Sequence, residues 1–246
     1  HVPYNDLDAL KAAISDRTCA VLLEPIQGEG GVLPAEKAYL EGARALCDQH
    51  DALLVFDEVQ TGMGRSGELF AYMHYGVTPD ILTFAKGVTS GTVPMGGCMV
   101  RQGIYDKFMN GPDHVIELFH GYTYTGHPMA AAAGVATMDL YRDEKIFENA
   151  LKLENVWADA AFTLKGHPLV EDIRTIGLVA AIDLKPIEGS PGLRAYKAME
   201  NGFHDGGLLM RITGDTIALS PPLIINENQI DEIFSDKMMK VLASVS

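Results

Sequence analysis

The sequence predicts an α/β protein with a mostly parallel sheet, followed by a smaller α+β part. Two observations favour this class. Short apolar runs that end abruptly in polar residues recur through the first half of the chain, and helical patterns separate them, as in strands joined by right-handed crossovers. From about residue 139 the chain alternates charged helical stretches with short strand candidates, so we expect two domains, at residues 1–138 and 139–246.

The first predicted domain alternates strand and helix patterns. Strands are expected in residues 19–26, 52–59, 81–88 and 94–100, the last with no predicted direction. Helices are expected in residues 5–14, 35–50 and 127–144. Asn5 could cap the first helix, and Pro128 suits the first position of the third, whose alanine-rich run predicts tight packing. The run Leu53–Asp57 is almost pure hydrocarbon until its acid, which is typical of a strand covered on both faces.

The second predicted domain has a different pattern. A charged helix is expected in residues 145–166, strands in residues 171–184 and 207–225, and a terminal helix after Asn226. The chain has 246 residues and is 47% hydrophobic, which is enough for a proper core.

Charge and cysteine content exclude several classes of protein. Lys and Arg number 19 against 33 Asp and Glu, a formal net charge of -14, which repels phosphate backbones and acidic membranes; we therefore expect no nucleic-acid or membrane partner. Because no apolar run reaches the roughly 18 residues of a membrane span and no export signal is visible, a cytoplasmic location is expected. Cys19, Cys47 and Cys98 are predicted to be small buried core residues without metal-binding spacing.

The segment GMGRSG, residues 62–67, matches the G-x-G-x-x-G pattern of dinucleotide-binding proteins. That fingerprint requires a glycine directly after the strand and an acid that ends the next strand. Here four residues follow Asp57 before the first glycine, and Asp80 precedes the next strand instead of ending it. Despite these two departures from the fingerprint, a nicotinamide-dependent oxidoreductase is an alternative from a different class of enzyme.

Asp57 and Lys86 each follow an apolar strand pattern. Ligands bind outside the carboxyl ends of parallel strands, so both residues are expected where chemistry is done. Partial burial would lower the pKa of the lysine and make its amine a nucleophile. A lysine and an acid in this arrangement suit pyridoxal 5'-phosphate: the lysine forms a Schiff base with the aldehyde, and the carboxylate keeps the pyridine nitrogen protonated. The alternatives are a solvated lysine and an acid that caps the following turn.

The stretch LLVFDEVQTGMGRSGELFAYMHYGVTPDILTFAKG, residues 53–87, resembles the signature of the class III pyridoxal-phosphate-dependent aminotransferases. The resemblance continues through EPIQGEGGVLP before it and HGYTYTGHPMAAAAG after it. LMRITGDTIALSPPLII, residues 209–225, resembles the C-terminal domain of the ω-amino acid:pyruvate branch. The resemblance implies a fold-type I transferase with an incomplete large cofactor-binding domain and a small C-terminal domain. The family's N-terminal part, with its phosphate loop and ring-stacking aromatic residue, is not found.

The same resemblance implies a role for each matching residue. Lys86 would form the Schiff base and Asp57 would pair with the pyridinium nitrogen. Val59 would pack against the ring, and Gln60 would lie near its phenolic oxygen. Thr123 would bind the cofactor phosphate across a dimer interface. Arg211 matches the movable arginine that grips the substrate carboxylate.

The implied activity is transfer of an amino group from an ω-amino acid or amine to pyruvate or a similar keto acid, by a homodimer or larger homo-oligomer. An ornithine-, acetylornithine- or 4-aminobutyrate-type transaminase that uses 2-oxoglutarate is the alternative, because EPIQGEGG is shared with those enzymes. Acetylornithine-type relatives carry an arginine in the segment matching TIALSPP, where this chain has Ala218. A non-catalytic fragment that pairs with its missing half is a third hypothesis.

Three further polar residues have two interpretations each. His120 and His127 flank the threonine segment, but they lack a third convergent ligand, which favours structural histidines over a metal site. Glu24 ends a predicted strand at the same edge as Asp57, where it could contact substrate or hold the following loop.

Overall fold

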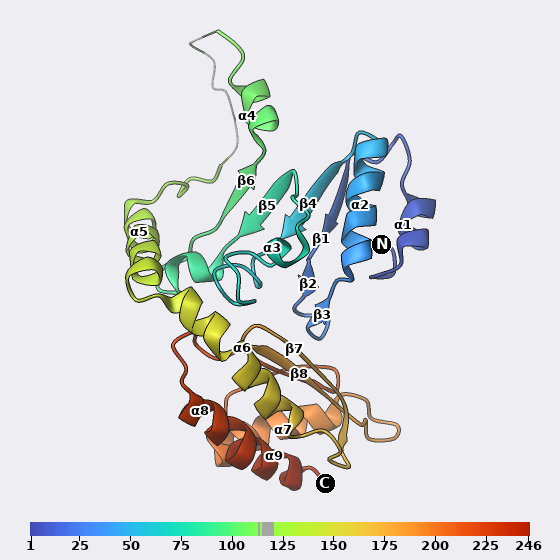
Figure 1. The fold of residues 1–246 in the computed structure, drawn as a ribbon, viewed down its shortest axis with the longest axis vertical. Coiled ribbons are helices and arrows are strands. Elements are labelled where there is room, and N and C mark those ends of the chain that lie inside the picture. The colour runs from blue at the N-terminus through green and yellow to red at the C-terminus, as the bar shows by residue number, and fades with distance from the viewer. Residues whose placement is uncertain (113, 115–120) are drawn as a thin grey trace. The chain divides into compact units, whose positions relative to one another are not determined.

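A computed structural model of the chain describes residues 1–112, 114 and 121–246 (Figure 1). The described chain forms two compact units. The first contains His1–Pro25, Ala35–Gly62 and Tyr72–Asp143; the second contains Ile26–Pro34, Met63–Ala71 and Glu144–Ser246. Two short segments of the amino-terminal half thus belong to the second unit. The domain boundary at residue 138 stays a prediction.

Among the described residues, the first unit holds a four-stranded sheet in the order β1-β4-β5-β6. Its strands are β1 (Ala20–Leu23), β4 (Leu53–Asp57), β5 (Ile81–Phe84) and β6 (Gly97–Val100). β1, β4 and β5 are parallel, and β6 is antiparallel to β5. The predicted mostly parallel sheet is therefore confirmed, and the strand within residues 94–100 has a direction that the sequence did not predict.

The helices α1 (Leu7–Ala13) and α2 (Lys37–Gln49) pack with one face of this sheet in a common apolar core (Figure 1). Burial along β4 alternates, as the period of two in a strand requires. Leu54 and Phe56 are fully buried in this core, whereas Asp57 belongs to the half-buried opposite face.

The predicted cap of the first helix is wrong. Asp6 is the N-cap, and its Oδ1 accepts a hydrogen bond from the Ala9 amide at 2.8 Å. Asn5 lies one residue too early for this geometry, because a capping side chain reaches the amide two or three residues into the helix. Its Oδ1 instead accepts from the Glu36 amide, also at 2.8 Å.

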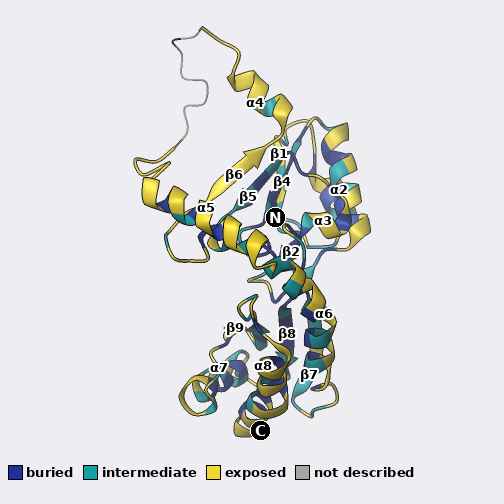
Figure 2. Ribbon diagram, turned by 60° about the vertical axis from the view of Figure 1, so that its left-hand side comes forward, coloured by how far each residue is buried: buried dark blue, intermediate teal, exposed yellow. Residues whose placement is uncertain are grey.

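Two predictions about packing in the first unit are also wrong. Cys47 is buried, but Cys19 and Cys98 are exposed, because Cys19 precedes an edge strand and Cys98 lies in the exposed edge strand β6. The alanine-rich helix is not tightly packed along its length (Figure 2). It is α5 (Pro128–Asp143), in which Ala130, Gly134 and Thr137 are the buried residues. The unit also contains α3 (Tyr72–Tyr75), the 3-10 helix η1 (Lys86–Thr89) and α4 (Gln102–Phe108).

In the described residues of the second unit, four antiparallel strands form a sheet in the order β7-β8-β10-β9. They are β7 (Val170–Ile176), β8 (Val179–Leu184), β10 (Thr216–Leu219) and β9 (Arg211–Thr213). The helical elements are α6 (Ile146–Phe162), α7 (Leu193–Asn201), α8 (Glu227–Asp231), α9 (Met238–Ser244) and the π-helical turns η2 (Gly202–Gly206) and η3 (Glu232–Lys237). The predicted α+β character of this region is confirmed.

The two faces of the second sheet differ in character. One face, with Ile182 and Ile217, packs into a core around Trp157 and Phe234. Ala181, on the other face, packs against the hairpin formed by β2 (Ile26–Gln27) and β3 (Leu33–Pro34). In the described part of both units, no helix combines the length and apolar character that crossing a membrane requires.

Candidate active site

The carboxyl ends of β4 and β5 place two of the predicted residues at one edge of the first sheet. The strands are parallel neighbours, and Asp57, the last residue of β4, lies opposite Thr83 of β5. Lys86 follows the end of β5 by two residues. Asp57 and Lys86 therefore share the edge at which open parallel sheets bind ligands. That both side chains face one cofactor stays a prediction.

Asp57 is half-buried and has an oxygen free for a ligand. Its Oδ1 accepts a hydrogen bond from the Val59 amide at 2.9 Å, and within the described chain its other oxygen has no hydrogen-bond partner. Glu58 projects the other way, as strand alternation predicts, and is 1% exposed. Its two oxygens accept from the Thr61 hydroxyl at 2.5 Å and the Tyr72 amide at 2.7 Å. Glu58 thus has a structural role that leaves Asp57 as the available acid.

Lys86 has an unusual backbone conformation and an exposed side chain. Its φ is +46°, the left-handed region that a residue with a side chain adopts at a cost of about 1 kcal/mol. The surrounding segment is held in place: the Lys86 carbonyl accepts from the Gly91 amide at 3.2 Å, and the Gly87 carbonyl accepts from the Tyr141 hydroxyl of α5 at 2.7 Å. Strained residues of this kind persist where neighbouring structure fixes them, and they are concentrated at functional sites.

The donor set at this edge fits pyridoxal phosphate. Lys86 offers a primary amine for the aldehyde, and Asp57 offers a carboxylate for the ring nitrogen. Thr83, the register partner of Asp57, carries a buried hydroxyl that has no hydrogen-bond partner among the described residues. Val59 and Gln60 are half-buried just beyond β4. These residues thus offer a nucleophile in Lys86, an acid in Asp57 and, in Thr83, a hydroxyl without a partner in the described chain.

The remaining predicted residues of the first unit lie in other segments. Thr123 is exposed, in a turn that precedes α5. His127 has a structural contact, because its Nδ1 accepts from the Met129 amide at 3.2 Å; His120 lies outside the described residues. Glu24 is half-buried just after β1, and its carbonyl accepts from the Tyr4 hydroxyl at 2.7 Å.

Arg211 belongs to the second unit and makes a two-point ion pair with Glu29. Its Nη1 lies 2.7 Å from Glu29 Oε1, and its Nη2 lies 2.5 Å from Glu29 Oε2. This fork-to-carboxylate geometry is the one with which arginine recognises a carboxylate ligand. Sequence reasoning missed Glu29, whose only local signal is its place in the glycine-rich QGEGG segment.

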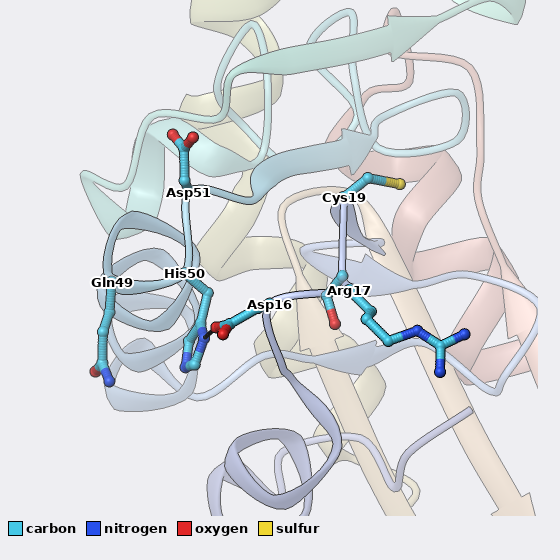
Figure 3. Close-up of a pocket in the computed structure, with 7 residues that line it drawn as sticks. Asp16, Arg17, Cys19, Gln49, His50 and Asp51 are labelled. Carbon is cyan, nitrogen blue, oxygen red and sulfur yellow. Dashed lines mark ion pairs between the residues drawn. The ribbon is translucent and has the colours of Figure 1, made fainter.

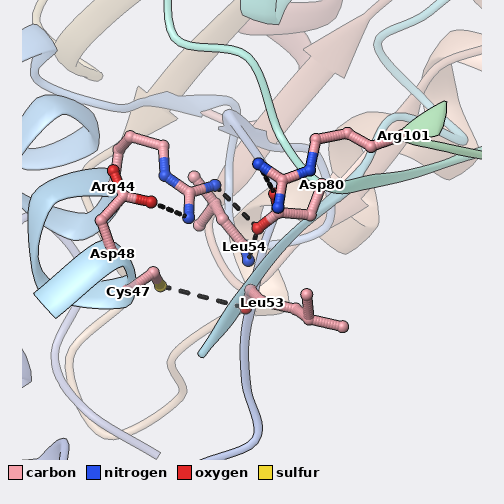
Figure 4. Close-up of polar contacts among 7 residues, drawn as sticks. All are labelled: Arg44, Cys47, Asp48, Leu53, Leu54, Asp80 and Arg101. Atoms are coloured by element: carbon pink, nitrogen blue, oxygen red, sulfur yellow. Dashed lines mark hydrogen bonds and ion pairs between the residues drawn. The ribbon is translucent and has the colours of Figure 1, made fainter. Parts of the chain in front are cut away.

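The structure gives no support to the dinucleotide alternative. The turn at residues 62–67 leads into irregular chain, and the next helix, α3, has four residues and begins at Tyr72. A pyrophosphate site would require a helix that begins at the glycines. Asp80 is 2% exposed and already engaged (Figure 4): its Oδ2 accepts from Arg44 Nη1 at 2.8 Å and from the Leu54 amide at 2.7 Å. Arg101 Nη1 lies 2.9 Å from Oδ1.

A pocket of about 440 Å³ lies at the opposite edge of the first sheet (Figure 3). It is lined by Asp16, Arg17, Thr18, Cys19, Gln49, His50 and Asp51. These residues precede β1 and β4, so the pocket is at the amino ends of the strands. None of the predicted site residues lines it.

Comparison with known proteins shows the family of the chain. The family model described as aminotransferase class III matches residues 2–242. The chain belongs to the class III aminotransferase family. The predicted family and its fold-type I architecture are thereby confirmed.

The class III relatives include enzymes named for different amino donors. An omega-aminotransferase from Caulobacter vibrioides is 50% identical over 226 residues, which are 92% of this chain and 51% of the relative. A succinylornithine transaminase/acetylornithine aminotransferase from Pseudomonas aeruginosa is 45% identical over 94% of this chain and 55% of the relative. The solved ornithine aminotransferase from Plasmodium yoelii has a TM-score of 0.84 at 35% identity, covering 100% of this chain and 63% of that one. The chain thus spans about half the length of its curated class III relatives.

Proposed function

We propose that the protein is a pyridoxal-phosphate-dependent aminotransferase that moves an amino group from an ω-amino acid or amine to pyruvate or a similar keto acid. The observation that carries this proposal is the position of Asp57 and Lys86 at the carboxyl ends of adjacent parallel strands, in a chain of the class III family. When bound, pyridoxal phosphate supplies an aldehyde that condenses with amines and a ring that accepts electrons.

The chain's own residues have separate tasks in this proposal. Lys86 holds the aldehyde between turnovers, and its freed amine moves a proton to and from the substrate carbon that bears nitrogen. The Asp57 carboxylate holds the proton of the ring nitrogen. Val59 packs against the ring, Gln60 lies near its phenolic oxygen, and Thr123 binds the phosphate across a homodimer interface. A cytoplasmic location is part of the same proposal.

The ion pair between Arg211 and Glu29 gives the proposed substrate site two states. A substrate carboxylate that binds Arg211 must displace the carboxylate of Glu29, since one guanidinium fork binds one carboxylate at two points. An amine without a carboxylate can bind while the pair stays closed. One site could thus accept both an amine donor and a keto acid.

A donor of the ornithine or acetylornithine type with 2-oxoglutarate is the second candidate. It is favoured by the 45% identity to the Pseudomonas aeruginosa relative. Ala218 in place of that group's arginine does not oppose it, because the arginine at position 211 is close to the same place in the sheet. Ala218 lies directly opposite Arg211 in the β9-β10 pair. Since cross-strand partners project from the same face, an arginine at either position would serve the same surface.

Amine transfer by the natural protein that contains this chain tests the proposal. A panel of ω-amino acids, simple amines, ornithine and acetylornithine is assayed against pyruvate and 2-oxoglutarate. We expect transfer to pyruvate from ω-amino acids or amines, and a loss of at least about 100-fold in rate for Lys86→Ala. Lys107→Ala, which removes another exposed lysine of the first unit, is the matched control. An unchanged rate in Lys86→Ala would refute the proposal, and ornithine with 2-oxoglutarate as the best pair would favour the second candidate.

A further inference from the structure

Two arginines of the second unit stand at opposite ends of one row across its sheet. Arg174 of β7 is the register partner of Ala181 in β8, and Ala181 is the partner of Ala218 in β10. Ala218 is in turn the partner of Arg211 in β9. All four side chains therefore project from one face, and three strand spacings separate the arginines by roughly 14 Å.

The turn Gly28–Val32 is bound by both arginines. Arg174 Nη2 donates to the Gly31 carbonyl at 2.8 Å, and Arg211 binds the carboxylate of Glu29 at 2.7 and 2.5 Å. Between the arginines, Ala181 packs in a small apolar cluster with Val32 of the turn. The row thus holds the turn by a backbone oxygen at one end and a carboxylate at the other.

The conformation of this turn needs support from outside. Val32 has φ +53°, and Gly31 has φ +108°. Within the turn, the Gly31 and Val32 amides both donate to the Gly28 carbonyl, at 3.2 and 3.3 Å. A left-handed valine is sterically costly and persists only when its surroundings fix it. Arg174 contributes such a contact.

Two carboxylates fix Arg174, and a hydroxyl supports one of these carboxylates. Its Nη1 and Nη2 bind the two oxygens of Asp183 at 2.6 and 2.9 Å, and Nη1 also lies 2.6 Å from Asp172 Oδ2. The Thr216 hydroxyl donates to Asp183 Oδ1 at 2.7 Å. This fork geometry orients the guanidinium so that Nη2 also donates to the Gly31 carbonyl.

We propose that Arg174 is a positioning residue that acts through the turn: it holds Glu29 against Arg211 and so sets how readily a substrate carboxylate displaces Glu29. The kinetic part of this proposal rests on the proposed function of Arg211. The structural part, that Arg174 orders the turn, does not.

Hydrogen exchange tests the structural part without any catalysis. In Arg174→Met, the Gly31 and Val32 amides should exchange at least about tenfold faster than in the wild type, because the turn loses a charged hydrogen bond. Arg194→Met is the matched control, since Arg194 also binds backbone carbonyls of the second unit, at Lys185 and Val245, but not the turn. Arg174→Lys is the second variant, for use if Arg174→Met does not fold. It keeps the charge but lacks the guanidinium fork, so it should also speed exchange. Unchanged exchange in the folded Arg174 variant overturns the proposal.

The kinetic part is tested by a double-mutant cycle. With Glu29 less firmly held, KM for pyruvate should fall about threefold in Arg174→Met, in the range of an exposed ion pair, with little change in KM for an amine that lacks a carboxylate. In a Glu29→Gln background the same substitution should have no further effect on KM. An equal effect in both backgrounds would show that Arg174 does not act through Glu29. If the wild type transfers no amine at all, the proposed function fails, and hydrogen exchange still decides the role of Arg174 in the turn.

Discussion

Three acids near the ends of β4 and β5 have different surroundings, and these surroundings decide what each can do. Glu58 is buried, with a hydrogen bond to each oxygen, so it fixes the chain after β4. Asp80 is buried between two arginines at the amino end of β5. Asp57 is half-buried with one oxygen bonded to the Val59 amide. Of the three, Asp57 is the one placed to serve a ligand.

Asp80→Asn should destabilise the first unit by about 3 kcal/mol, because it leaves the Arg44 guanidinium without its buried partner. Urea unfolding measures the loss in free energy. Asp48→Asn is the control: it pairs with the same Arg44, but its side chain is 63% exposed, so the cost should stay below about 1 kcal/mol. Equal losses in the two variants would contradict the structural role given to Asp80.

Glu29→Gln should lower KM for pyruvate about twofold to fivefold, since it removes the internal competitor for Arg211. Steady-state kinetics with an amine donor at saturation measures this change. Glu188→Gln removes the same charge from an exposed turn of the same unit and should leave KM unchanged. A raised KM in Glu29→Gln would show that Glu29 assists binding of the keto acid instead of competing with it.

Asp183 should contribute acid-dependent stability. Burial acts to raise the pKa of its carboxyl, but hydrogen bonds from Arg174 and Thr216 outweigh burial and hold it below its usual value of 3.8. A carboxyl whose pKa is depressed in the folded state stabilises the fold above its unfolded pKa and loses that contribution as the pH falls below about 4. The free energy of unfolding should therefore fall more steeply between pH 5 and about pH 2 in the wild type than in Asp183→Asn. Parallel curves would show that Asp183 makes no such contribution.

At the scale of elements, the β7-β8 hairpin has a glycine that packing requires. Gly177 has φ +51°, and a Cβ at this position would lie 2.4 Å from the Ser66 carbonyl carbon and 2.7 Å from the Arg65 oxygen. Because both neighbours are backbone atoms, no side chain can move to make room. The hairpin and the segment at residues 63–71 therefore fit together only with glycine here.

Gly177→Ala should destabilise the second unit by more than about 2 kcal/mol, through clash and backbone strain together. Gly214→Ala is the matched control, since Gly214 has φ +57° with open space around it and should cost only about 1 kcal/mol of strain. Thermal unfolding of both variants measures the difference. A loss in Gly177→Ala no greater than in Gly214→Ala would contradict the packing.

Elements were predictable where a local pattern determines them. The apolar runs predicted the strands. β4, for example, lies between two other strands and has one fully buried face, so it requires apolar residues. The N-cap of the first helix was misplaced because Asn5 and Asp6 are both good caps, and only the geometry of the chain selects Asp6. The direction of β6 depends on its pairing with β5, which its own residues do not encode.

At the scale of the site, the sequence could point only to residues in continuous motifs. Asp57 and Lys86 belong to one recognisable stretch, whereas Glu29 meets Arg211 across 182 positions of sequence. Arg174 and Gly31 are 143 positions apart. Such contacts arise because residues 26–34 belong to the second unit, where their hairpin packs against the second sheet, and no local pattern reports them.

At the scale of the whole molecule, the family and the fold are established, and the two units hold different parts of the proposed chemistry. Asp57, Lys86 and Thr123 belong to the first unit, and Arg211 with Glu29 to the second. The first group matters most, because the nature of the proposed reaction follows from an amine and an acid at the same sheet edge.

The most direct test is to identify the lysine that binds the cofactor. The natural protein that contains this chain is incubated with pyridoxal phosphate, reduced with borohydride, digested and analysed by peptide mass spectrometry. We expect one pyridoxyl group on Nζ of Lys86, reduced in yield by Asp57→Ala and absent in Lys86→Ala. Stoichiometric labelling of another lysine, or no labelling of the wild type, would contradict it.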